Sequence, residues 1–343
     1  MSNIILFDGD SRGHLLPLTY SRPVASLRVG ILTIQEKWAR HLRMPSSFLT
    51  QEYLADLFPL VIADNNLLIN GDLLPTPEIV ALILDLNPGQ AYLKNGELLA
   101  ACLDRTAVEE LSKDEDFGEI AAFELEDQPL FRVTAPGDIF GLNDLALRDD
   151  FALITAGRKS QPLPPSNTLI GPVENLFIEE GARVEACIIN TEDGPVYFGK
   201  DCVILEGCML RSPLSVGEGA VIKMGAKIYG ATTLGPSTKV GGEINNVVFY
   251  GNCNKGHDGF LGNAAIGEWC NIGADTNSSN LRNDYGEVRV WSYPEGRFAK
   301  TGKQFHGLIM ADHAKTGINT MFNTGTVVGF STNVFGEGFP RTF

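Results

Sequence analysis

The sequence predicts two domains of different class, an α/β domain over residues 1–157 and an all-β parallel β-helix over residues 166–343, joined by a linker at 158–165. Three observations support this division. Strand-like and helix-like segments alternate in the first part, and a six-residue apolar period runs through the second. Glycine usage also changes, from 10 in the first 160 residues to 27 in the remaining 183.

The first domain is expected to contain a mostly parallel sheet, because its strands and helices alternate along the chain. The apolar run at 4–7 predicts a buried strand, and residues 61–62 and 67–70 form further short apolar runs. Ile34, Trp38 and Leu42 share one face of a predicted helix, and Thr76-Pro77 is a typical helix start. A further helix is expected at 143–148. The Pro-rich segment at 158–165 then predicts a linker.

The second domain is predicted from a file of large apolar residues at every sixth position. These residues are Phe198, Ile204, Leu210, Val216, Ile222, Ile228, Leu234 and Val240. A second file, small except for Leu214, lies four positions after each of the first seven. Neither a helical nor a simple strand period produces this pattern. It predicts triangular coils in which each hexad forms one short strand and one corner, with glycines such as Gly199, Gly217 and Gly235 at corners.

The hexad phase is lost between residues 243 and 261, and a polar excursion runs from about 277 to 304. The last hexads lie at 310–334. A solenoid needs a cap on its last coil, and the sequence shows none. We therefore expect that the chain continues beyond Phe343 or that a neighbouring subunit covers the coil.

Composition excludes several classes of function. The net charge is −15, of which −11 falls in residues 1–160, so binding to nucleic acid or to an anionic membrane is disfavoured. No apolar run reaches membrane-spanning length. Six cysteines without C-x-x-C spacing predict reduced packing residues, and hence a cytoplasmic protein. Five scattered histidines give little support to a zinc enzyme of the carbonic-anhydrase-like hexad type.

The hexad pattern resembles the left-handed β-helix of hexapeptide-repeat transferases. Lys255-Gly256-His257, followed by an I-G-x-x-x-N-I-G-A segment at 266–274, makes the resemblance more specific. It is similar to the acetyltransferase domain of the GlmU family, the bifunctional glucosamine-1-phosphate acetyltransferases and N-acetylglucosamine-1-phosphate uridylyltransferases. That family implies acetyl-CoA or another acyl-CoA as donor and a homotrimer with the active site between adjacent subunits.

Matched residue by residue, the resemblance implies that His257 is the catalytic base. An imidazole suits this role because it exchanges a proton near neutral pH. The residues expected to bind the sugar substrate are Arg211, Glu243, Asn271 and Asn280.

Three departures from the family pattern concern the acceptor. Asn245-Asn246 replaces a pair of lysines, Phe260 replaces a tyrosine, and Asp275 interrupts the G-A-G-T segment. The acceptor is therefore expected to differ from glucosamine 1-phosphate.

The first domain resembles sugar nucleotidyltransferases more faintly, through Pro17-Leu18-Thr19 and Pro23 in a P-L-T-x-x-x-P segment. This resemblance implies a nucleotide-binding loop containing Gly9, Arg12 and Arg22. It also implies that Asp72, in an N-G-D segment, holds Mg²⁺ beside a nucleoside triphosphate. Val24 stands where that family has a lysine, so arginines would supply the positive charge.

Two functions from different classes follow. The first is a transferase acting on a sugar phosphate or nucleotide sugar, with acyl transfer at His257 and nucleotide binding or Mg²⁺-dependent nucleotidyl transfer in the first domain. The alternative is a catalytically degenerate, nucleotide-sugar-binding regulatory or scaffold trimer. Release of CoA separates them, because a scaffold does not break a thioester.

Overall fold

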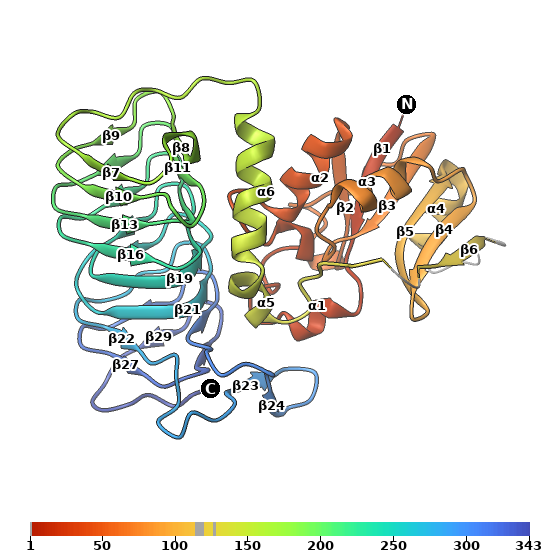
Figure 1. Ribbon diagram of the computed structural model, residues 1–343. Helices are drawn as coiled ribbons and strands as arrows, with labels where there is room; N and C mark the ends of the chain where they lie inside the picture. Colours follow the sequence, from red (N-terminus) through yellow and green to blue (C-terminus); the bar gives the residue numbers. More distant parts are fainter. Residues whose placement is uncertain (1, 114–119, 126–127) are drawn as a thin grey trace. The chain divides into compact units, whose positions relative to one another are not determined.

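The computed structural model describes residues 2–113, 120–125 and 128–343 (Figure 1). The chain forms two compact units. The first comprises residues 1–15, 21–27 and 32–134, and the second comprises 16–20, 28–31 and 135–343. The contacts thus divide the chain before residue 135, whereas the sequence-based boundary lies in the linker at 158–165. The sequence-based boundaries stay a prediction.

The first unit is a six-stranded mixed sheet with helices. Its strands are β1 (Ser2–Phe7), β2 (Ser46–Leu49), β3 (Asn65–Asn70), β4 (Gln90–Lys94), β5 (Glu97–Asp104) and β6 (Ala121–Glu124), in the order β2-β1-β3-β5-β4-β6. The β1 strand is parallel to β2 and β3, β5 is antiparallel to β3 and β4, and β6 is parallel to β4. The helices are α1 (Ser11–His14), α2 (Ile34–Leu42), α3 (Pro77–Leu84) and α4 (Arg105–Leu111), with 3-10 turns η1 (Val24–Ser26) and η2 (Glu52–Leu54).

Local sequence accounts for the two main helices of this unit. Thr33 caps α2 by accepting from the Glu36 amide at 3.2 Å, and the Glu36 carboxylate accepts from the Thr33 amide at 2.7 Å. Trp38 is fully buried, and its indole donates to the Leu73 carbonyl at 2.8 Å. Thr76 caps α3, with Pro77 in the first turn, as the sequence predicted.

The second unit is a β-solenoid of about nine turns over residues 168–334 (Figure 1). The predicted class, an α/β domain followed by a parallel β-helix, is therefore confirmed, and the solenoid is consistent with the left-handed form. All eight residues of the apolar file are buried, and so are the seven residues four positions later. Each strand bonds in parallel to the equivalent strand of the next coil.

Three faces make up the stack. The first contains β7 (Thr168–Ile170), β10 (Ile188–Asn190), β13 (Met209–Arg211), β16 (Lys227–Tyr229), β22 (Asn277–Ser278) and β27 (Met321–Phe322). The second contains β8 (Leu176–Ile178), β11 (Val196–Phe198), β14 (Leu214–Val216), β17 (Thr232–Leu234), β25 (Ile309–Met310) and β28 (Val327–Val328). The third contains β9 (Arg183–Val184), β12 (Val203–Ile204), β15 (Val221–Ile222), β18 (Lys239–Val240), β20 (Asn254–Lys255), β26 (Lys315–Thr316) and β29 (Asn333–Val334).

The lost hexad phase has a simple structural cause. Strands β19 (Glu243–Phe249) and β21 (Phe260–Ile266) each run through the first and second faces in one continuous strand. Met209 pairs with Lys227, eighteen residues later, but Lys227 pairs with Glu243 after only sixteen. The coils therefore stay stacked while their corners shorten, so that a fixed period of six no longer describes them.

The glycines at corners are required by space rather than by backbone conformation. Gly199, Gly217 and Gly235 do not have positive φ. A Cβ at Gly235 would lie 2.0 Å from the Tyr250 carbonyl oxygen, and one at Gly217 would lie 2.8 Å from that of Leu234. The coils approach too closely at this corner for any side chain, so the predicted conformational reason is replaced by a steric one.

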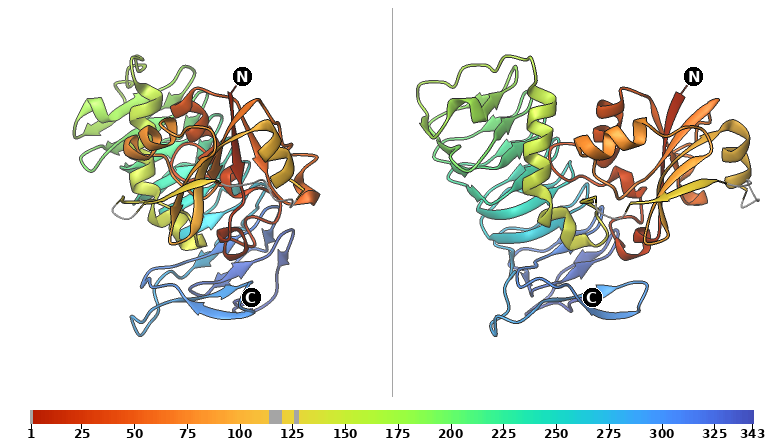
Figure 2. Two further views of the ribbon diagram at one scale, coloured as in Figure 1. Left: turned by 90° about the vertical axis from the view of Figure 1, so that its right-hand side faces the viewer. Right: turned by 45° about the vertical axis from the view of Figure 1, so that its right-hand side comes forward.

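Two helices of the same unit, α5 (Pro136–Gly141) and α6 (Asn143–Thr155), pack on the solenoid (Figure 1). The Asn143 amide donates to the Ala231 carbonyl at 2.8 Å, and its oxygen accepts from the Thr233 hydroxyl at 3.1 Å. A 3-10 turn, η3 (Val173–Asn175), lies in the first coil. Between β22 and β25 an antiparallel hairpin, β23 (Arg289–Ser292) and β24 (Arg297–Lys300), leaves the stack (Figure 2).

The remaining general predictions concern cysteines and membrane spans. All six cysteines are buried and none forms a disulfide. Within the described residues, no helix is both long and apolar enough to cross a membrane.

Candidate functional site

His257 lies on the corner of the solenoid between β20 and β21, formed by residues 256–259. Its side chain is exposed, and no hydrogen bond of the described residues involves its imidazole. The backbone amides of residues 256–259 likewise donate to no acceptor within the described chain. Gly259 has a φ of +117°, and a Cβ there would lie 2.1 Å from the Thr276 carbonyl oxygen. Because only glycine fits, the corner holds a fixed turn with its amides unengaged.

A buried lysine lies beneath this corner. Lys255 pairs in register with Val240 of the preceding coil and is 1% exposed, so it occupies an inward position of the solenoid. Its ammonium donates to the carbonyl of His257 at 2.9 Å and to that of Gly241 at 3.1 Å. Burial lowers the pKa of Lys255 to about 8. The lysine therefore links the backbone of the His257 corner to the preceding coil.

Two of the predicted substrate residues lie on coils next to this corner. The Glu243 amide donates to the Gly259 carbonyl at 3.3 Å, which places Glu243 on the coil before His257. Its carboxylate accepts from the Tyr229 hydroxyl at 2.6 Å and raises the pKa of Tyr229 to about 12. Asn271 lies on the following coil, where its side-chain oxygen accepts from Asn254 at 2.8 Å.

The other two predicted substrate residues lie elsewhere on the solenoid. Asn280 donates to the side chain of Asn263 at 2.7 Å, at the corner between the first and second faces. In the amide orientation that satisfies its neighbours, Asn246 accepts from Asn263 at 3.0 Å, so these three asparagines form a ladder. Arg211 ends β13 and forms an exposed pair with Asp193 at 3.2 Å. Within one chain the structure does not bring Arg211 or Asn280 to His257.

In the first unit, polar residues gather where β1, β2 and β3 end. These strands are parallel, so their carboxyl ends meet at one edge of the sheet. Asp8 follows β1 and accepts from the Thr50 hydroxyl at 2.6 Å, from the Val24 amide at 2.7 Å and from the Arg12 guanidinium at 3.1 Å. Burial raises the pKa of Asp8 despite these bonds. The Arg12 guanidinium also donates to the Tyr53 hydroxyl at 2.7 Å.

The predicted glycine of this loop is packed against the protein itself. A Cβ at Gly9 would lie 2.7 Å from the side-chain nitrogen of Asn70, so the close approach that glycine allows is used by a neighbouring strand end. Arg22 is 8% exposed in the segment before η1. The structure thus places Gly9 and Arg12 at one sheet edge, and Arg22 in a buried position.

Asp72 is the predicted Mg²⁺ ligand, and both of its oxygens bind an arginine. Arg132 donates to one oxygen from Nε and to the other from Nη2, each at 2.7 Å, and it also donates twice to Glu97 at 2.7 Å. Burial alone would lower the pKa of Arg132, but these hydrogen bonds outweigh it and raise that pKa. They also lower the pKa of Glu97. Asp72 is 0% exposed.

This arrangement does not fit a metal ion. A divalent cation needs oxygen ligands that are free to approach it, and the oxygens of Asp72 face a guanidinium. Among the described residues, no group of three His, Cys, Asp or Glu side chains is arranged to hold a metal. That Asp72 binds Mg²⁺ stays a prediction, without support from this geometry.

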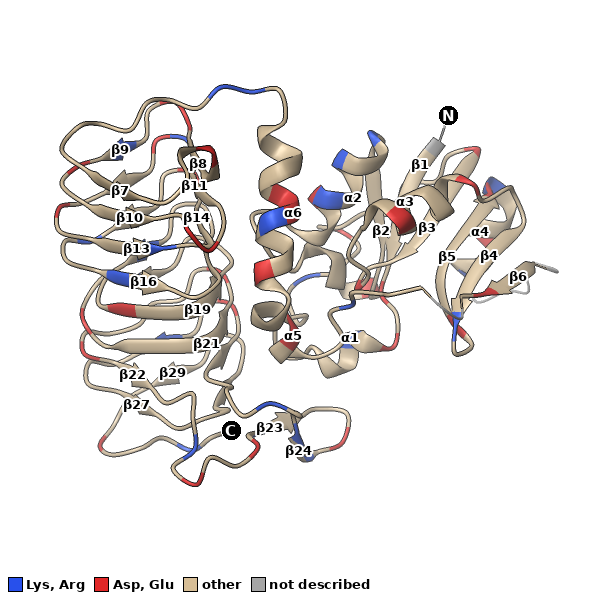
Figure 3. Cartoon of the chain, in the orientation of Figure 1, with Lys and Arg blue, Asp and Glu red and all other residues tan. Residues whose placement is uncertain are grey.

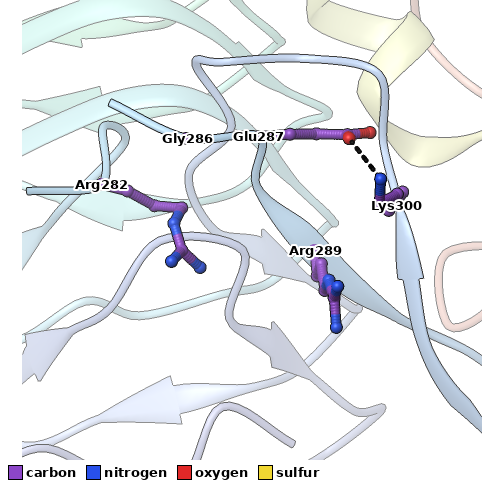
Figure 4. Close-up of a pocket in the computed structure, with 5 residues that line it drawn as sticks. All are labelled: Arg282, Gly286, Glu287, Arg289 and Lys300. Carbon is purple, nitrogen blue, oxygen red and sulfur yellow. Dashed lines mark ion pairs between the residues drawn. The ribbon is translucent and has the colours of Figure 1, made fainter. Parts of the chain in front are cut away.

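A basic cavity that the sequence did not predict lies at the excursion between β22 and β25. It measures about 480 Å³ and is lined by Arg282, Gly286, Glu287, Arg289 and Lys300 (Figure 4). Basic residues mark the hairpin and the loop before it in Figure 3. The polar excursion was visible in the sequence, but its convergence on a cavity depends on how the hairpin folds back.

Sequence reasoning also missed Lys255, Glu97 and Arg132 as partners of the predicted residues. Lys255 could not be recognised as an inward residue, because the hexad phase is lost at the shortened corners. Arg132 lies sixty residues from Asp72 in the sequence, and the antiparallel bridge between Leu73 and Arg132 brings the two segments together.

Comparison with known proteins supports the resemblance of the first domain to sugar nucleotidyl transferases and the resemblance of the chain to the GlmU family. Residues 4–159 match the family model described as a sugar nucleotidyl transferase. A relative named bifunctional protein GlmU from Geotalea uraniireducens is 26% identical over 173 residues, which cover 44% of this chain and 38% of that protein.

Two further relatives carry the same name. The protein from Synechococcus elongatus is 21% identical over 215 residues, 56% of this chain and 43% of that protein. The one from Methanocaldococcus jannaschii is 36% identical over 100 residues, 29% of this chain and 24% of that protein. The matches thus span less than half the length of these relatives. The chain resembles the GlmU-like transferases, and residues 4–159 match the sugar nucleotidyl transferase model.

Proposed function

We propose that this chain is a transferase for a sugar phosphate or nucleotide sugar, in which the corner at residues 256–259 transfers an acyl group from an acyl-CoA. The observation that carries the proposal is the exposed imidazole of His257 beside backbone amides that have no acceptor within the described chain. The relatives named bifunctional GlmU and the match to a sugar nucleotidyl transferase family model support the transferase class.

In this reaction His257 is the general base. It takes a proton from the amine or hydroxyl of the acceptor as that group attacks the thioester carbonyl. The resulting oxyanion is stabilised by the unengaged amides of the corner. Collapse of the tetrahedral intermediate breaks the carbon–sulfur bond, and the thiolate receives the proton from the imidazolium. Lys255 holds the His257 carbonyl and so fixes the direction of the neighbouring amides.

The experiment measures release of free CoA thiol from acetyl-CoA in the presence of a panel of amino sugars, sugar 1-phosphates and nucleotide sugars. His257→Ala should lower turnover by roughly 10² to 10⁴-fold, the usual contribution of a general base. Its melting temperature should not change, because the side chain is exposed. His313→Ala is the matched control, since His313 is another exposed corner histidine that stacks on Trp269. Equal turnover in the wild type and His257→Ala would refute the proposal.

For the first unit we propose nucleotide binding at the sheet edge that contains Asp8, Gly9 and Arg12. The match of residues 4–159 to a sugar nucleotidyl transferase supports this. We derive no step through Mg²⁺, because Arg132 engages both oxygens of Asp72. A thermal-shift series with UTP, dTTP and GTP, each with and without Mg²⁺, tests this proposal. A hundredfold excess of ligand over Kd should stabilise the fold by about 2.7 kcal/mol.

The second candidate function is a nucleotide-sugar-binding regulatory or scaffold trimer. The closed Asp72–Arg132 pair and the phenylalanine at position 260 favour it, because both remove groups that the family resemblance would use. Absence of CoA release across the panel, together with a trimer in light scattering, would support this function. A homotrimer is expected under either proposal.

A further inference from the structure

The basic cavity at the β23–β24 hairpin is built from two opposed cations and a third from the preceding loop. Arg289 and Lys300 are direct partners across the antiparallel hairpin, and Arg282 lies in the loop before it (Figure 4). Like charges directly opposite one another destabilise a hairpin. Binding of an anion between the two cations would offset this repulsion.

The three cations are not equally engaged within the chain. Arg282 donates to Asp284 at 2.9 Å from Nε and at 2.7 Å from Nη2, which raises the pKa of Arg282. Lys300 lies 3.6 Å from Glu287, and no hydrogen bond is formed between them. Arg289 has no ion pair and no side-chain hydrogen bond within the described residues. The whole guanidinium of Arg289 and the Nη1 group of Arg282 are thus available to a ligand.

The charge of this segment contrasts with that of the whole chain. Residues 277–305 carry five basic and three acidic residues, in a chain whose net charge is −15. Each internal pair fixes the position of a cation without neutralising Arg289. A guanidinium presents a planar fork of donors that matches the oxygens of a phosphoryl group.

Neutral donors and an apolar wall adjoin the cations. Two neighbouring cavities share Arg282 and are lined by Asn323 and Thr324, and Phe298 lines one of the two. Trp291 stacks on Phe343 with ring centroids 4.3 Å apart and meets Phe298 edge to face at 5.4 Å. Amides and hydroxyls beside the Phe298 ring of the adjoining cavity suit a sugar or nucleoside, and the volume of about 480 Å³ of the basic cavity exceeds what inorganic phosphate alone would fill.

We propose that this cavity is a binding site for a phosphoryl group carried on a sugar or nucleoside, with Arg289 as its principal ligand and Arg282 and Lys300 beside it. The site lies at the hairpin, apart from the corner that bears His257. It concerns binding alone, so it holds whether or not His257 is a catalyst. CoA, a sugar 1-phosphate and a nucleoside diphosphate all carry the required group.

The test is isothermal titration of the whole chain with CoA, dephospho-CoA, glucosamine 1-phosphate, UDP and pyrophosphate at two salt concentrations. At least one of these compounds should bind, more weakly at the higher salt concentration. Arg289→Gln should weaken that binding tenfold or more. The compound that loses most affinity identifies the source of the phosphoryl group.

Arg297→Gln is the matched control, because Arg297 belongs to the same hairpin, pairs with Glu295 and lies outside the cavity lining. Its affinity should equal that of the wild type. Melting temperatures of both variants check that the hairpin is intact. No binding by the wild-type chain, or equal losses in Arg289→Gln and Arg297→Gln, would overturn the proposal. Because the titration measures binding, a failure to detect acyl transfer in a separate assay would count against the role of His257 and not against this binding site.

Discussion

The sheet edge of the first unit and the His257 corner of the solenoid both contain residues that match a transferase motif, yet they differ in what those residues contact. At the sheet edge, Asp8 accepts from three donors and Asp72 is enclosed by Arg132. At the corner, the His257 imidazole and the amides around it have no partner within the described chain. A motif therefore gives the residue types, and the internal partners decide whether those residues remain available to a ligand.

The largest expected effect concerns Arg132→Gln, which removes the partner of a fully buried carboxylate. Breaking a buried ion pair from one side typically costs 3–5 kcal/mol, so we expect the free energy of unfolding in urea to fall by about that amount. Arg105→Gln is the control, because Arg105 forms exposed pairs with Asp64 and Glu109.

Adding Mg²⁺ to the Arg132 variant sharpens the comparison. With the guanidinium gone, Asp72 and Glu97 become available as oxygen ligands, so Mg²⁺ should raise the melting temperature of the variant and leave the wild type unchanged. Stabilisation of the wild type by Mg²⁺ alone would show that the pair opens in solution, and the contrast between the two regions would be lost.

Lys255→Met tests the buried lysine beneath the His257 corner through the pH dependence of the free energy of unfolding. A pKa lowered from 10.5 to about 8 corresponds to roughly 3 kcal/mol. Between these values the unfolded chain binds the proton and the folded chain does not, so this lysine adds stability as pH rises from about 8 to 10.5. The difference in unfolding free energy between wild type and Lys255→Met should therefore grow in favour of the wild type across that window. A constant difference would mean that the pKa of Lys255 is the same in the folded and the unfolded chain, so that burial does not lower it.

A smaller effect is expected for Thr50→Val, which deletes the 2.6 Å hydrogen bond to Asp8. Bonds to charged groups contribute about 1.5–3 kcal/mol. Burial already raises the pKa of Asp8, and loss of the Thr50 donor raises it further. Above the unfolded pKa of 3.8 the folded chain keeps a proton that the unfolded chain has released, so the free energy of unfolding falls as pH rises. This fall is larger in the variant. The variant should be more destabilised at pH 7 than at pH 4. Thr155→Val, which loses a bond to the neutral Phe151 carbonyl, should show no such difference.

The smallest effect on stability is expected for Arg211→Gln, because its pair with Asp193 is exposed and contributes less than about 1 kcal/mol. If Arg211 binds the acceptor phosphate from a neighbouring subunit, KM for the acceptor should rise about tenfold while kcat stays within twofold. An unchanged KM would remove Arg211 from the candidate site.

Much of the fold could be predicted because it repeats a local rule. The file from Phe198 to Val240 places a large apolar side chain inside each coil, and the structure buries every member. Thr33 and Thr76 similarly cap α2 and α3 through bonds that span only a few residues. The shortened corners around Asn246 were not predictable, because a coil of fewer residues still stacks if its strands keep their partners.

The candidate site divides in the same way. The position of His257 on a glycine-rich corner follows from Gly256 and Gly259, which the sequence shows directly. By contrast, the position of Asn280 in an asparagine ladder at a different corner from His257 could not be predicted, and its role in substrate binding stays a prediction. Motif spacing along the chain does not reveal which corner of a triangular coil a residue occupies once the period shifts.

The sequence by itself determined the two fold classes, the solenoid core and the residue types at the candidate sites, since these depend on periodicity and on neighbours a few positions apart. Only the tertiary structure decided that Arg132 closes Asp72, that Lys255 is buried beneath His257 and that Arg289 opposes Lys300 in a cavity. The interaction between two charges depends on their distance in space and on their burial. Neither quantity can be read from the spacing of the residues along the chain.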